Sequence, residues 1–199
     1  MSEQKPFSQA CENNKKAILD VLLRVFSDRQ KVFEVGSGTG QHAVYFSPKL
    51  PNLVWQTADL EVNHRGINAW INEFPTENIR PPLTLDADHP PWPYSPVDAV
   101  FTANTCHIMA WSSVINMFSG LDTLLARNGI LAIYGPFNYG GKFTSESNER
   151  FDQWLKQQAP HQGIRDFEAV NQLAEKIGFK LKEDNTMPAN NRLLVWERE

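Results

Sequence analysis

The sequence has few cysteines, no long apolar run and no excess of basic residues, and each shortage excludes a class of protein. Its two cysteines, Cys11 and Cys106, are too few and too far apart for a disulfide framework or a zinc motif. No segment approaches the roughly 20 apolar residues of a membrane-spanning helix. The net charge is −4, and no run of Lys or Arg occurs. The charge distribution argues against sequence-independent binding to nucleic acid and against binding to an anionic membrane.

A secretory signal is not indicated either, because the opening segment MSEQKPFSQACENNKK is polar and has no apolar core. We therefore expect a soluble, cytoplasmic protein with reduced thiols, folded as a single domain over residues 1–199. The sequence also lacks a nucleophile elbow, a phosphate-binding lysine loop and paired histidines at helical spacing, so no metal site is expected. Nothing in the sequence points to one oligomeric state.

Strand-like apolar runs alternate with helical spacing along the chain. Helices are predicted at residues 8–26, 41–46, 67–74, 114–125, 146–158 and 166–177. Strands are predicted at residues 31–35, 53–60, 81–88, 97–103 and 129–137, with two more in the tail on either side of a turn at 187–190. This alternation predicts an α/β sandwich with a mainly parallel sheet. The last two strands leave no room for a crossover helix, so they should pair antiparallel.

Three glycines at alternate positions, Gly36, Gly38 and Gly40, stand between the first predicted strand and the next helix. In an open parallel sheet such a loop lies at the carboxyl edge, where it can bring backbone N–H groups to a ligand. The dinucleotide fingerprint G-x-G-x-x-G/A needs a small residue at the position of Gln41. The loop therefore departs from the pattern for NAD or NADP.

Acidic residues near the ends of the first three strands favour a different nucleoside. Glu34, expected at the mouth of the loop, would repel a pyrophosphate but suits S-adenosylmethionine (SAM), which carries an ammonium, a sulfonium and one carboxylate. Asp59 stands about 20 residues further on, where a ribose-binding acid is expected. Both nucleotide classes use such an acid, so Asp59 supports a ribose without choosing between them. Asp86 is placed for the adenine amino group. Gly and Asp are also common in turns, but their order and spacing favour a ligand. The candidate cofactor-binding residues are Glu34, Gly36, Ser37, Gly38, Gly40, Asp59, Leu60, Asp86, Ala87 and Asn104.

The motifs VFEVGSGTGQHA, TADLE and LDAD resemble those of class I SAM-dependent methyltransferases. NNKKAIL, YGPF, FTSESNERFDQWL, GIRDFE and MPANN resemble a small family of uncharacterised methyltransferase-like proteins. The resemblance implies a Rossmann-like three-layer sandwich, a seven-stranded mainly parallel sheet with an antiparallel last strand, and SAM as cofactor. It implies no particular substrate. The chain departs from the family pattern at ANTCHIMAW, where related chains have a more apolar lead-in to the His–Ile pair.

Polar clusters after the later strands should face the same edge of the sheet and line a site for the methyl acceptor. His107 is the candidate catalytic base, although a lone histidine is more often a structural hydrogen-bonding residue. Arg165 is placed to hold an anionic substrate or to pair with the neighbouring Asp166, itself an ordinary helix cap. The helix around residues 12–16 could close over the site, and His42 is interpreted as structural or adjacent to the cofactor. The candidate substrate-binding residues are Tyr134, Phe137, Asn138, Arg165 and Asn190, the last of which is also a favoured hairpin residue.

The sequence thus predicts a SAM-dependent methyltransferase that acts on a small-molecule acceptor, with neither nucleic acid nor membrane as a partner. Two alternatives stay open. The first is an NAD(P)-binding oxidoreductase, which Glu34 and Gln41 disfavour. The second is a non-catalytic SAM-binding protein that keeps the methyltransferase fold, because no sharp catalytic motif is present.

Overall fold

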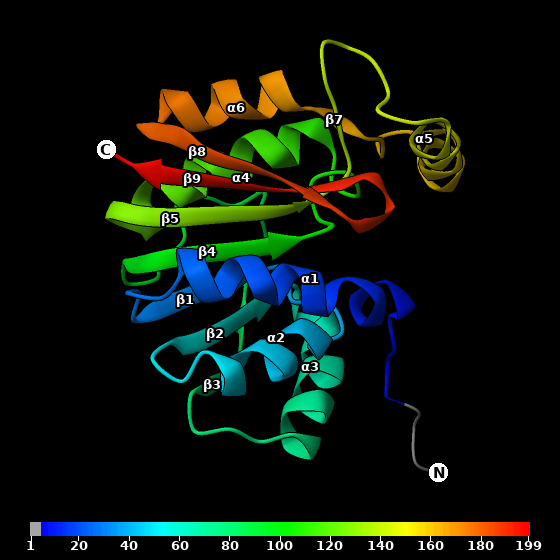
Figure 1. The fold of residues 1–199 in the computed structure, drawn as a ribbon. Coiled ribbons are helices and arrows are strands. Elements are labelled where there is room, and N and C mark those ends of the chain that lie inside the picture. Colours follow the sequence, from blue (N-terminus) through cyan, green and yellow to red (C-terminus); the bar gives the residue numbers. More distant parts are fainter. Residues whose placement is uncertain (1–4) are drawn as a thin grey trace.

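The computed structural model describes residues 5–199, so the first four residues of the expected domain lie outside the described part. A seven-stranded sheet forms its centre (Figure 1), with the strand order β3-β2-β1-β4-β5-β9-β8. The strands are β1 (Lys31–Val35), β2 (Val54–Asp59), β3 (Ile79–Thr84), β4 (Val97–Ala103), β5 (Leu125–Gly135), β8 (Phe179–Met187) and β9 (Asn191–Arg198).

The sheet is parallel from β3 to β5, and β9 runs antiparallel to both of its neighbours, β5 and β8. Only a short 3-10 turn, η2 (Pro188–Asn190), joins β8 to β9. A connection this short cannot carry the chain back across the sheet, so the two strands form a hairpin. The predicted seven-stranded sheet with an antiparallel last strand is confirmed.

Helices cover both faces of the sheet and complete three layers. One buried cluster joins the sheet to α1, α2 and α3, and a second joins it to α4 and α6. In α1, Ile18 and Leu22 are four residues apart and fully buried, which is the spacing of one helical face. The helices are α1 (Gln9–Val25), α2 (Gln41–Phe46), α3 (Glu61–Glu73), α4 (Trp111–Leu124), α5 (Glu146–Gln158) and α6 (Phe167–Lys176).

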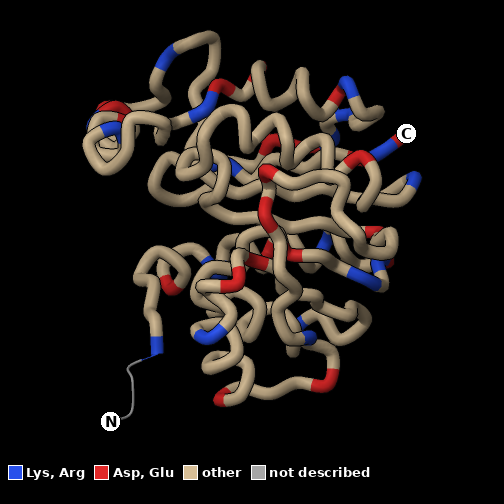
Figure 2. Tube along the Cα trace, turned by 180° about the vertical axis from the view of Figure 1, so that it is seen from behind, with Lys and Arg blue, Asp and Glu red and all other residues tan. Residues whose placement is uncertain are grey.

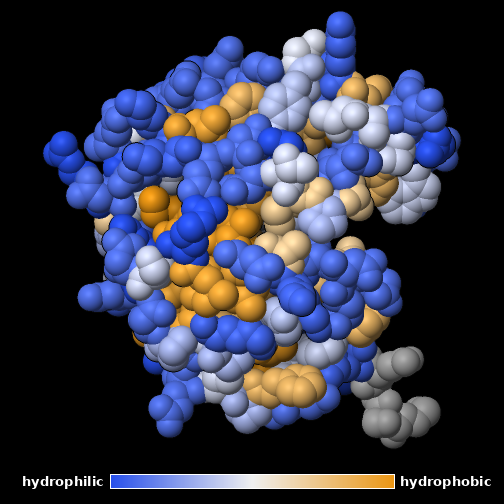
Figure 3. Space-filling view, in the orientation of Figure 1, coloured by the Kyte–Doolittle hydropathy of each residue, from blue (hydrophilic) through white to orange (hydrophobic). Residues whose placement is uncertain are grey.

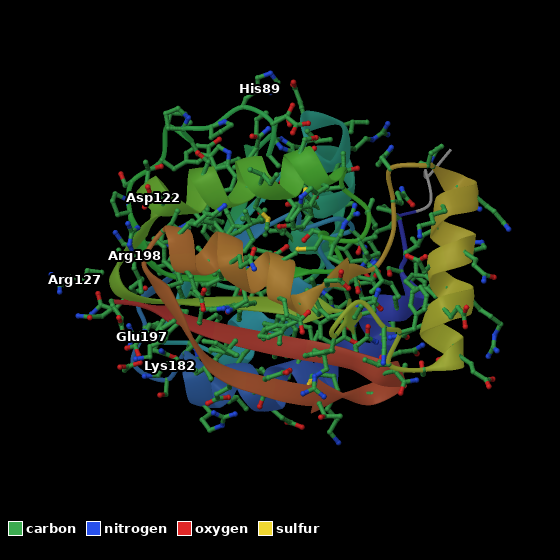
Figure 4. The ribbon with its side chains drawn as sticks, turned by 90° about the horizontal axis from the view of Figure 1, so that it is seen from above. His89, Asp122, Arg127, Lys182, Glu197 and Arg198 are labelled. Atoms are coloured by element: carbon green, nitrogen blue, oxygen red, sulfur yellow. The ribbon has the colours of Figure 1, made fainter. Side chains whose placement is uncertain are left out.

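The helix predicted at residues 146–158 is confirmed as α5, whereas the third strand, predicted at 81–88, is Ile79–Thr84, and the helix predicted at 67–74 is Glu61–Glu73. The structure also adds a strand pair that the sequence did not predict. Residues 165–166, expected to open a helix, form a short strand β7 (Arg165–Asp166) that pairs with β6 (Phe137–Asn138), so α6 starts just after them. Helix α5 lies beyond the carboxyl ends of the strands, beside the β8–β9 turn (Figures 1 and 4). The amide of Asn148 on α5 donates to the carbonyl of Asn190 in that turn at 3.1 Å.

The opposite, amino-end edge of the sheet carries ion pairs. Arg198 of β9 meets Asp122 of α4 at 2.6 Å, and Lys182 meets Glu197 at 2.8 Å (Figure 4). Figure 2 shows basic and acidic residues interspersed along the tube, without a long run of either sign. Within residues 5–199, no helix is both long enough and apolar enough to cross a bilayer.

Candidate functional site

A cleft of about 490 Å³ opens at the carboxyl edge of the sheet, within the range of small-molecule sites. The loops that follow β1, β2, β3 and β4 form its walls, and the first turn of α1 closes one side. Figure 3 shows the molecular surface hollowed on this side, between α5 and the start of α1. Eight predicted cofactor residues line the cleft: Gly36, Ser37, Gly38, Asp59, Leu60, Asp86, Ala87 and Asn104.

The backbone donors of the glycine loop are engaged inside the protein. The N–H groups of Gly36 and Ser37 both donate to the carbonyl of Ala58, at 3.0 and 3.1 Å. The N–H of Gly38 donates to Oδ2 of Asp59 at 2.6 Å, and that of Gly40 donates to the carbonyl of Ser37 at 2.9 Å. None of these four N–H groups is directed at a ligand, contrary to what the spacing suggested.

Gly36 allows the loops after β1 and β4 to meet. Its φ of +72° is left-handed, and a Cβ added to it would lie 2.6 Å from Cγ2 of Thr105. The hydroxyl of Thr102 donates to the carbonyl of Val35 at 2.7 Å, and a second hydroxyl contact of 2.7 Å joins Thr102 to Thr105. The floor of the cleft is therefore fixed by close backbone approach and by paired hydroxyls.

Glu34 lies beneath the glycine loop and not at its mouth, which corrects the sequence-based placement. It is 2% exposed and accepts hydrogen bonds from the Ser37 hydroxyl at 2.9 Å and from the Trp55 indole N–H at 3.1 Å. Burial raises the pKa of Glu34 from 4.5 to about 7, against these hydrogen bonds, and the nearby charge of Asp59 adds to the rise. Glu34 thus supports the loop from below and titrates near neutral pH.

Asp59, at the end of β2, lines the cleft, and its carboxylate also holds the neighbouring loops in place. Besides Gly38, its carboxylate accepts from the N–H of Leu60 and from the amide of Asn63, both at 2.7 Å. The Leu60 side chain, next in the chain, is 46% exposed and lines the cleft. An anchored carboxylate beside an exposed apolar side chain suits a sugar hydroxyl next to a planar base.

Further carboxylates stand at the end of β3. Asp86 accepts from the N–H of Asp88 at 2.9 Å and contacts Nδ1 of His89 at 3.0 Å. His89 itself points away from the molecule (Figure 4). Asp59, Asp86 and Asp88 all line the cleft, whereas its described lining contains no Lys or Arg. The cleft therefore favours a neutral or cationic ligand.

The loop after β4 supplies the opposite wall. Asn104 has a left-handed φ of 60°, and its N–H donates to the carbonyl of Tyr134 at 2.8 Å. Ile108 is 48% exposed and lines the cleft with Met109. Exposed apolar side chains therefore stand on both sides of the cleft, Leu60 on one wall and Ile108 on the other.

None of the predicted substrate-binding residues lines the described cleft. Phe137 is 1% exposed in the core, and Tyr134 is buried against the helices of the opposite face. Asn138 is buried, and its Oδ1 has no hydrogen-bond partner among the described residues. Tyr134 packs in the cluster with α1, α2 and α3, and Phe137 in the cluster with α4 and α6, so tertiary packing directs both side chains into the core. The positions of the strand ends alone do not give this direction.

Arg165 and Asn190 hold loops in place. Arg165 donates to the carbonyls of Cys106, Met109 and His161 at 2.9, 2.5 and 2.9 Å, so it clamps the loop after β4. Asn190, with a left-handed φ of 58°, donates to the Ser147 hydroxyl at 3.1 Å and ties the β8–β9 turn to α5. These contacts account for both side chains without a substrate.

His107, the predicted catalytic base, lies outside the cleft lining. Its ring is buried and meets the Phe151 ring of α5 edge-on, with centroids 5.5 Å apart. Burial, with a smaller effect of the Arg165 guanidinium, lowers the pKa of His107 to about 4. The contacts match the structural reading of this histidine.

The sequence analysis placed residues 12–16 of α1 over the site, but it missed the residues at the start of this helix that line the cleft. Ser8, the N-cap of α1, and Cys11, in its first turn, line the cleft with Thr39 and His42. Gln41 fixes this arrangement, because its amide accepts from the N–H of Ser8 at 2.5 Å and donates to Glu12 at 2.8 Å. The Ser8 cap signal predicted where α1 starts, but no spacing in the sequence tells where a helix docks.

A protein-family model described as "Protein of unknown function (DUF938)" matches residues 5–198. The chain belongs to the DUF938 family. Solved structures resemble this DUF938 chain in fold. An O-methyltransferase family protein from Burkholderia thailandensis has a TM-score of 0.82 at 15% identity over 93% of this chain and 56% of that one. The S-adenosylmethionine-dependent methyltransferase SibL, in its apo form, has a TM-score of 0.80 at 16% identity, over 95% of this chain and 55% of SibL.

A third similar structure is an O-methyltransferase family 2 protein from Planctomyces limnophilus in complex with apigenin, with a TM-score of 0.82 at 14% identity over 96% of this chain and 58% of that one. The DUF938 chain spans little more than half the length of these three proteins. At such identities the likeness establishes the fold, which is the Rossmann-like sandwich of class I methyltransferases.

Proposed function

We propose that this protein is a SAM-dependent methyltransferase that acts on a small-molecule acceptor. The observation that carries the proposal is that the backbone N–H groups of the glycine loop are already hydrogen-bonded within the protein. A pyrophosphate needs free N–H groups at this loop, but Gly36, Ser37 and Gly38 donate to Ala58 and Asp59. These contacts disfavour NAD and NADP.

The residues present fit an adenosyl group with a positive charge. Asp59 has carboxylate oxygens for the ribose hydroxyls, and the exposed side chains of Leu60 and Ile108 would be covered by a planar base. The described lining has three aspartates and no Lys or Arg, which suits the ammonium and sulfonium of SAM. When bound, SAM supplies a methyl group that its positive sulfur makes electrophilic. The chain then has to orient donor and acceptor and exclude water.

The acceptor class is proposed from the character of the cleft. Its lining is partly apolar and partly acidic, and Arg165 is occupied by three carbonyls, so a neutral or cationic compound fits better than an anion. One of the similar structures holds apigenin, a polyhydroxylated aromatic compound. Apigenin and simpler phenols, amines and thiols therefore form a first panel of acceptors.

Calorimetry with the purified protein tests the proposal. SAM and S-adenosylhomocysteine (SAH) should bind, and NAD and NADP should bind at least tenfold more weakly. Asp59→Asn should weaken SAH binding tenfold or more, because a hydrogen bond to a charged group contributes about 1.5–3 kcal/mol. Asp122→Asn, a matched change at the opposite edge of the sheet, should leave the affinity unchanged.

Tighter binding of NAD than of SAH would refute the proposal in favour of an oxidoreductase. Incubation of labelled SAM with the acceptor panel separates an enzyme from a non-catalytic SAM-binding protein. Turnover to SAH that depends on an added acceptor supports an enzyme.

A further inference from the structure

His42 is the histidine that reaches the cleft among the described residues. It stands in the first turn of α2, directly after the glycine loop, and lines the cleft together with Cys11 and Thr39. The ring is held by aromatic neighbours on two sides. It stacks on Phe46 with centroids 5.2 Å apart and an interplanar angle of 8°, and it meets Phe101 edge-on at 6.0 Å.

The hydrogen bond at one ring nitrogen defines the tautomer. Nε2 of His42 lies 2.7 Å from Oδ1 of Asn14 in α1, so Nε2 carries the proton and donates it to the amide oxygen. The Asn14 side chain is itself buried and lies near the hydroxyl of Tyr134 on β5. Nδ1 of His42 is then unprotonated, and its contact within residues 5–199 is the weak one to the Cys11 thiol.

Nδ1 of His42 meets another residue that lines the cleft. Sγ of Cys11, another cleft residue, lies 3.9 Å from Nδ1, in the position of a weak S–H donor. The charged groups that act on His42 are Glu12 and Lys15 of α1, which also pair with each other, and Glu34 of β1 acts on Cys11. Within the described part of the chain, no carboxylate bonds the ring directly. Burial lowers the pKa of His42 to about 4, so the imidazole is neutral at cellular pH.

A base whose other nitrogen is oriented by a third group is the usual arrangement for proton transfer. We propose that His42, oriented by Asn14, takes the proton that the methyl acceptor loses, and that His107 does not. The inference rests on the proposed function. A lone pair of the acceptor atom forms the bond to the methyl carbon, and the carbon–sulfur bond breaks with its electrons going to sulfur. The proton on the acceptor atom passes to Nδ1 of His42 and then to water.

Nitrogen NMR of protein labelled at histidine tests the geometry without an acceptor. His42, assigned by loss of its signals in His42→Gln, should show the Nε2–H tautomer from pH 5 to 8. Saturating SAH should shift the Nδ1 resonance of His42 more than that of any other histidine, and the exposed His161 should not move. An Nδ1–H tautomer, or an Nδ1 resonance that SAH leaves unchanged, would overturn the proposal.

Kinetics with a compound from the acceptor panel test the chemistry. His42→Gln should lower kcat about 100-fold or more, the usual contribution of a general base, while the Kd for SAH stays within threefold. His161→Gln should leave kcat unchanged. Asn14→Asp keeps an acceptor for Nε2–H but adds a negative charge that stabilises the imidazolium, so the acid limb of the pH–rate profile should move to higher pH.

If His42 has only a structural role, His42→Gln should lower the free energy of unfolding, and Asn14→Asp should leave the acid limb of the pH–rate profile where it is. Normal kcat in His42→Gln, or a 100-fold loss in His107→Gln alone, would refute the assignment. If the wild-type protein binds neither SAM nor SAH in calorimetry, the proposed function itself fails. If it binds SAH and His42→Gln has a normal kcat, only the role of His42 fails.

Discussion

Replacing Glu34 by Gln should stabilise the protein at pH 8 and leave its stability at pH 5 little changed. The Glu34 carboxyl is fully buried beneath the glycine loop and accepts from the Ser37 hydroxyl and the Trp55 N–H. A glutamine keeps an oxygen that can accept both hydrogen bonds, and it removes the ionisable group.

The size of the effect follows from the raised pKa. In the unfolded chain Glu34 ionises near 4.5, and in the folded protein burial raises its pKa to about 7. The folded state therefore binds the proton more tightly, so this contribution to stability is fully present below pH 4.5 and is lost as the pH rises through 7. At about 1.4 kcal/mol for each pH unit, the loss by pH 8 is about 3 kcal/mol. The glutamine N–H₂ needs a partner in the same site, which offsets about 1 kcal/mol.

Urea unfolding followed by tryptophan fluorescence at pH 5, 6, 7 and 8 measures this. The buried histidines His42 and His107 have lowered pKa values, so their contribution falls as the pH drops through about 4 and opposes that of Glu34. The histidines contribute equally to wild type and to Glu34→Gln, so they cancel in the difference between the two free energies of unfolding. That difference should grow by about 2–3 kcal/mol in favour of the variant from pH 5 to pH 8.

A matched control is Glu197→Gln, at the opposite edge of the sheet, where the carboxylate pairs with Lys182. The free energy of unfolding of Glu197→Gln should stay within about 1 kcal/mol of the wild-type value, as is usual for exposed ion pairs. This difference should not grow in favour of the variant between pH 5 and pH 8. A difference for Glu34→Gln that is the same at pH 5 and pH 8 would refute the reasoning about the buried carboxyl.

Three further results are expected. The affinity for SAM should rise between pH 6 and 8 more than that for SAH, because ionised Glu34 adds negative charge near Asp59 that attracts a sulfonium; calorimetry showing parallel curves would contradict this. Gly36→Ala should destabilise the fold by more than about 1 kcal/mol in urea unfolding and weaken SAH binding, since its Cβ would meet Thr105 at 2.6 Å with φ at +72°; unchanged stability and affinity would count against the close approach. Phe137→Ala should cost about 3–5 kcal/mol of stability as a core truncation, with normal SAH affinity of the folded protein; a loss of acceptor use at normal stability would return Phe137 to the substrate site.

The fold could be predicted from the sequence because its signals are local. Apolar runs such as residues 31–35 and 97–103 are short, and helical spacing follows each of them, so the parallel sheet follows from the alternation. The antiparallel β9 follows from the short connection at residues 188–190. Pairing of residues 165–166 with residues 137–138 could not be foreseen, because a two-residue strand leaves no periodic pattern.

The site was predicted where it depends on strand ends and missed where it depends on packing. Asp59 and Asp86 follow consecutive strands of a parallel sheet, so their arrival at one edge follows from topology. Whether a side chain near a strand end points into the cleft or into the core, as for Phe137, is decided by tertiary contacts. The docking of α1, which brings Asn14 to His42, is a contact between residues 28 positions apart that no local pattern encodes.

A crystal structure of the protein grown with SAH would show directly whether the cleft holds an adenosyl group. We expect the ribose hydroxyls on the carboxylate of Asp59 and the base between Leu60 and Ile108, with the glycine-loop N–H groups still bonded to Ala58 and Asp59. Density for SAH elsewhere on the protein would contradict it. So would a dinucleotide bound in its place, with its pyrophosphate on the N–H groups of Gly36 and Gly38.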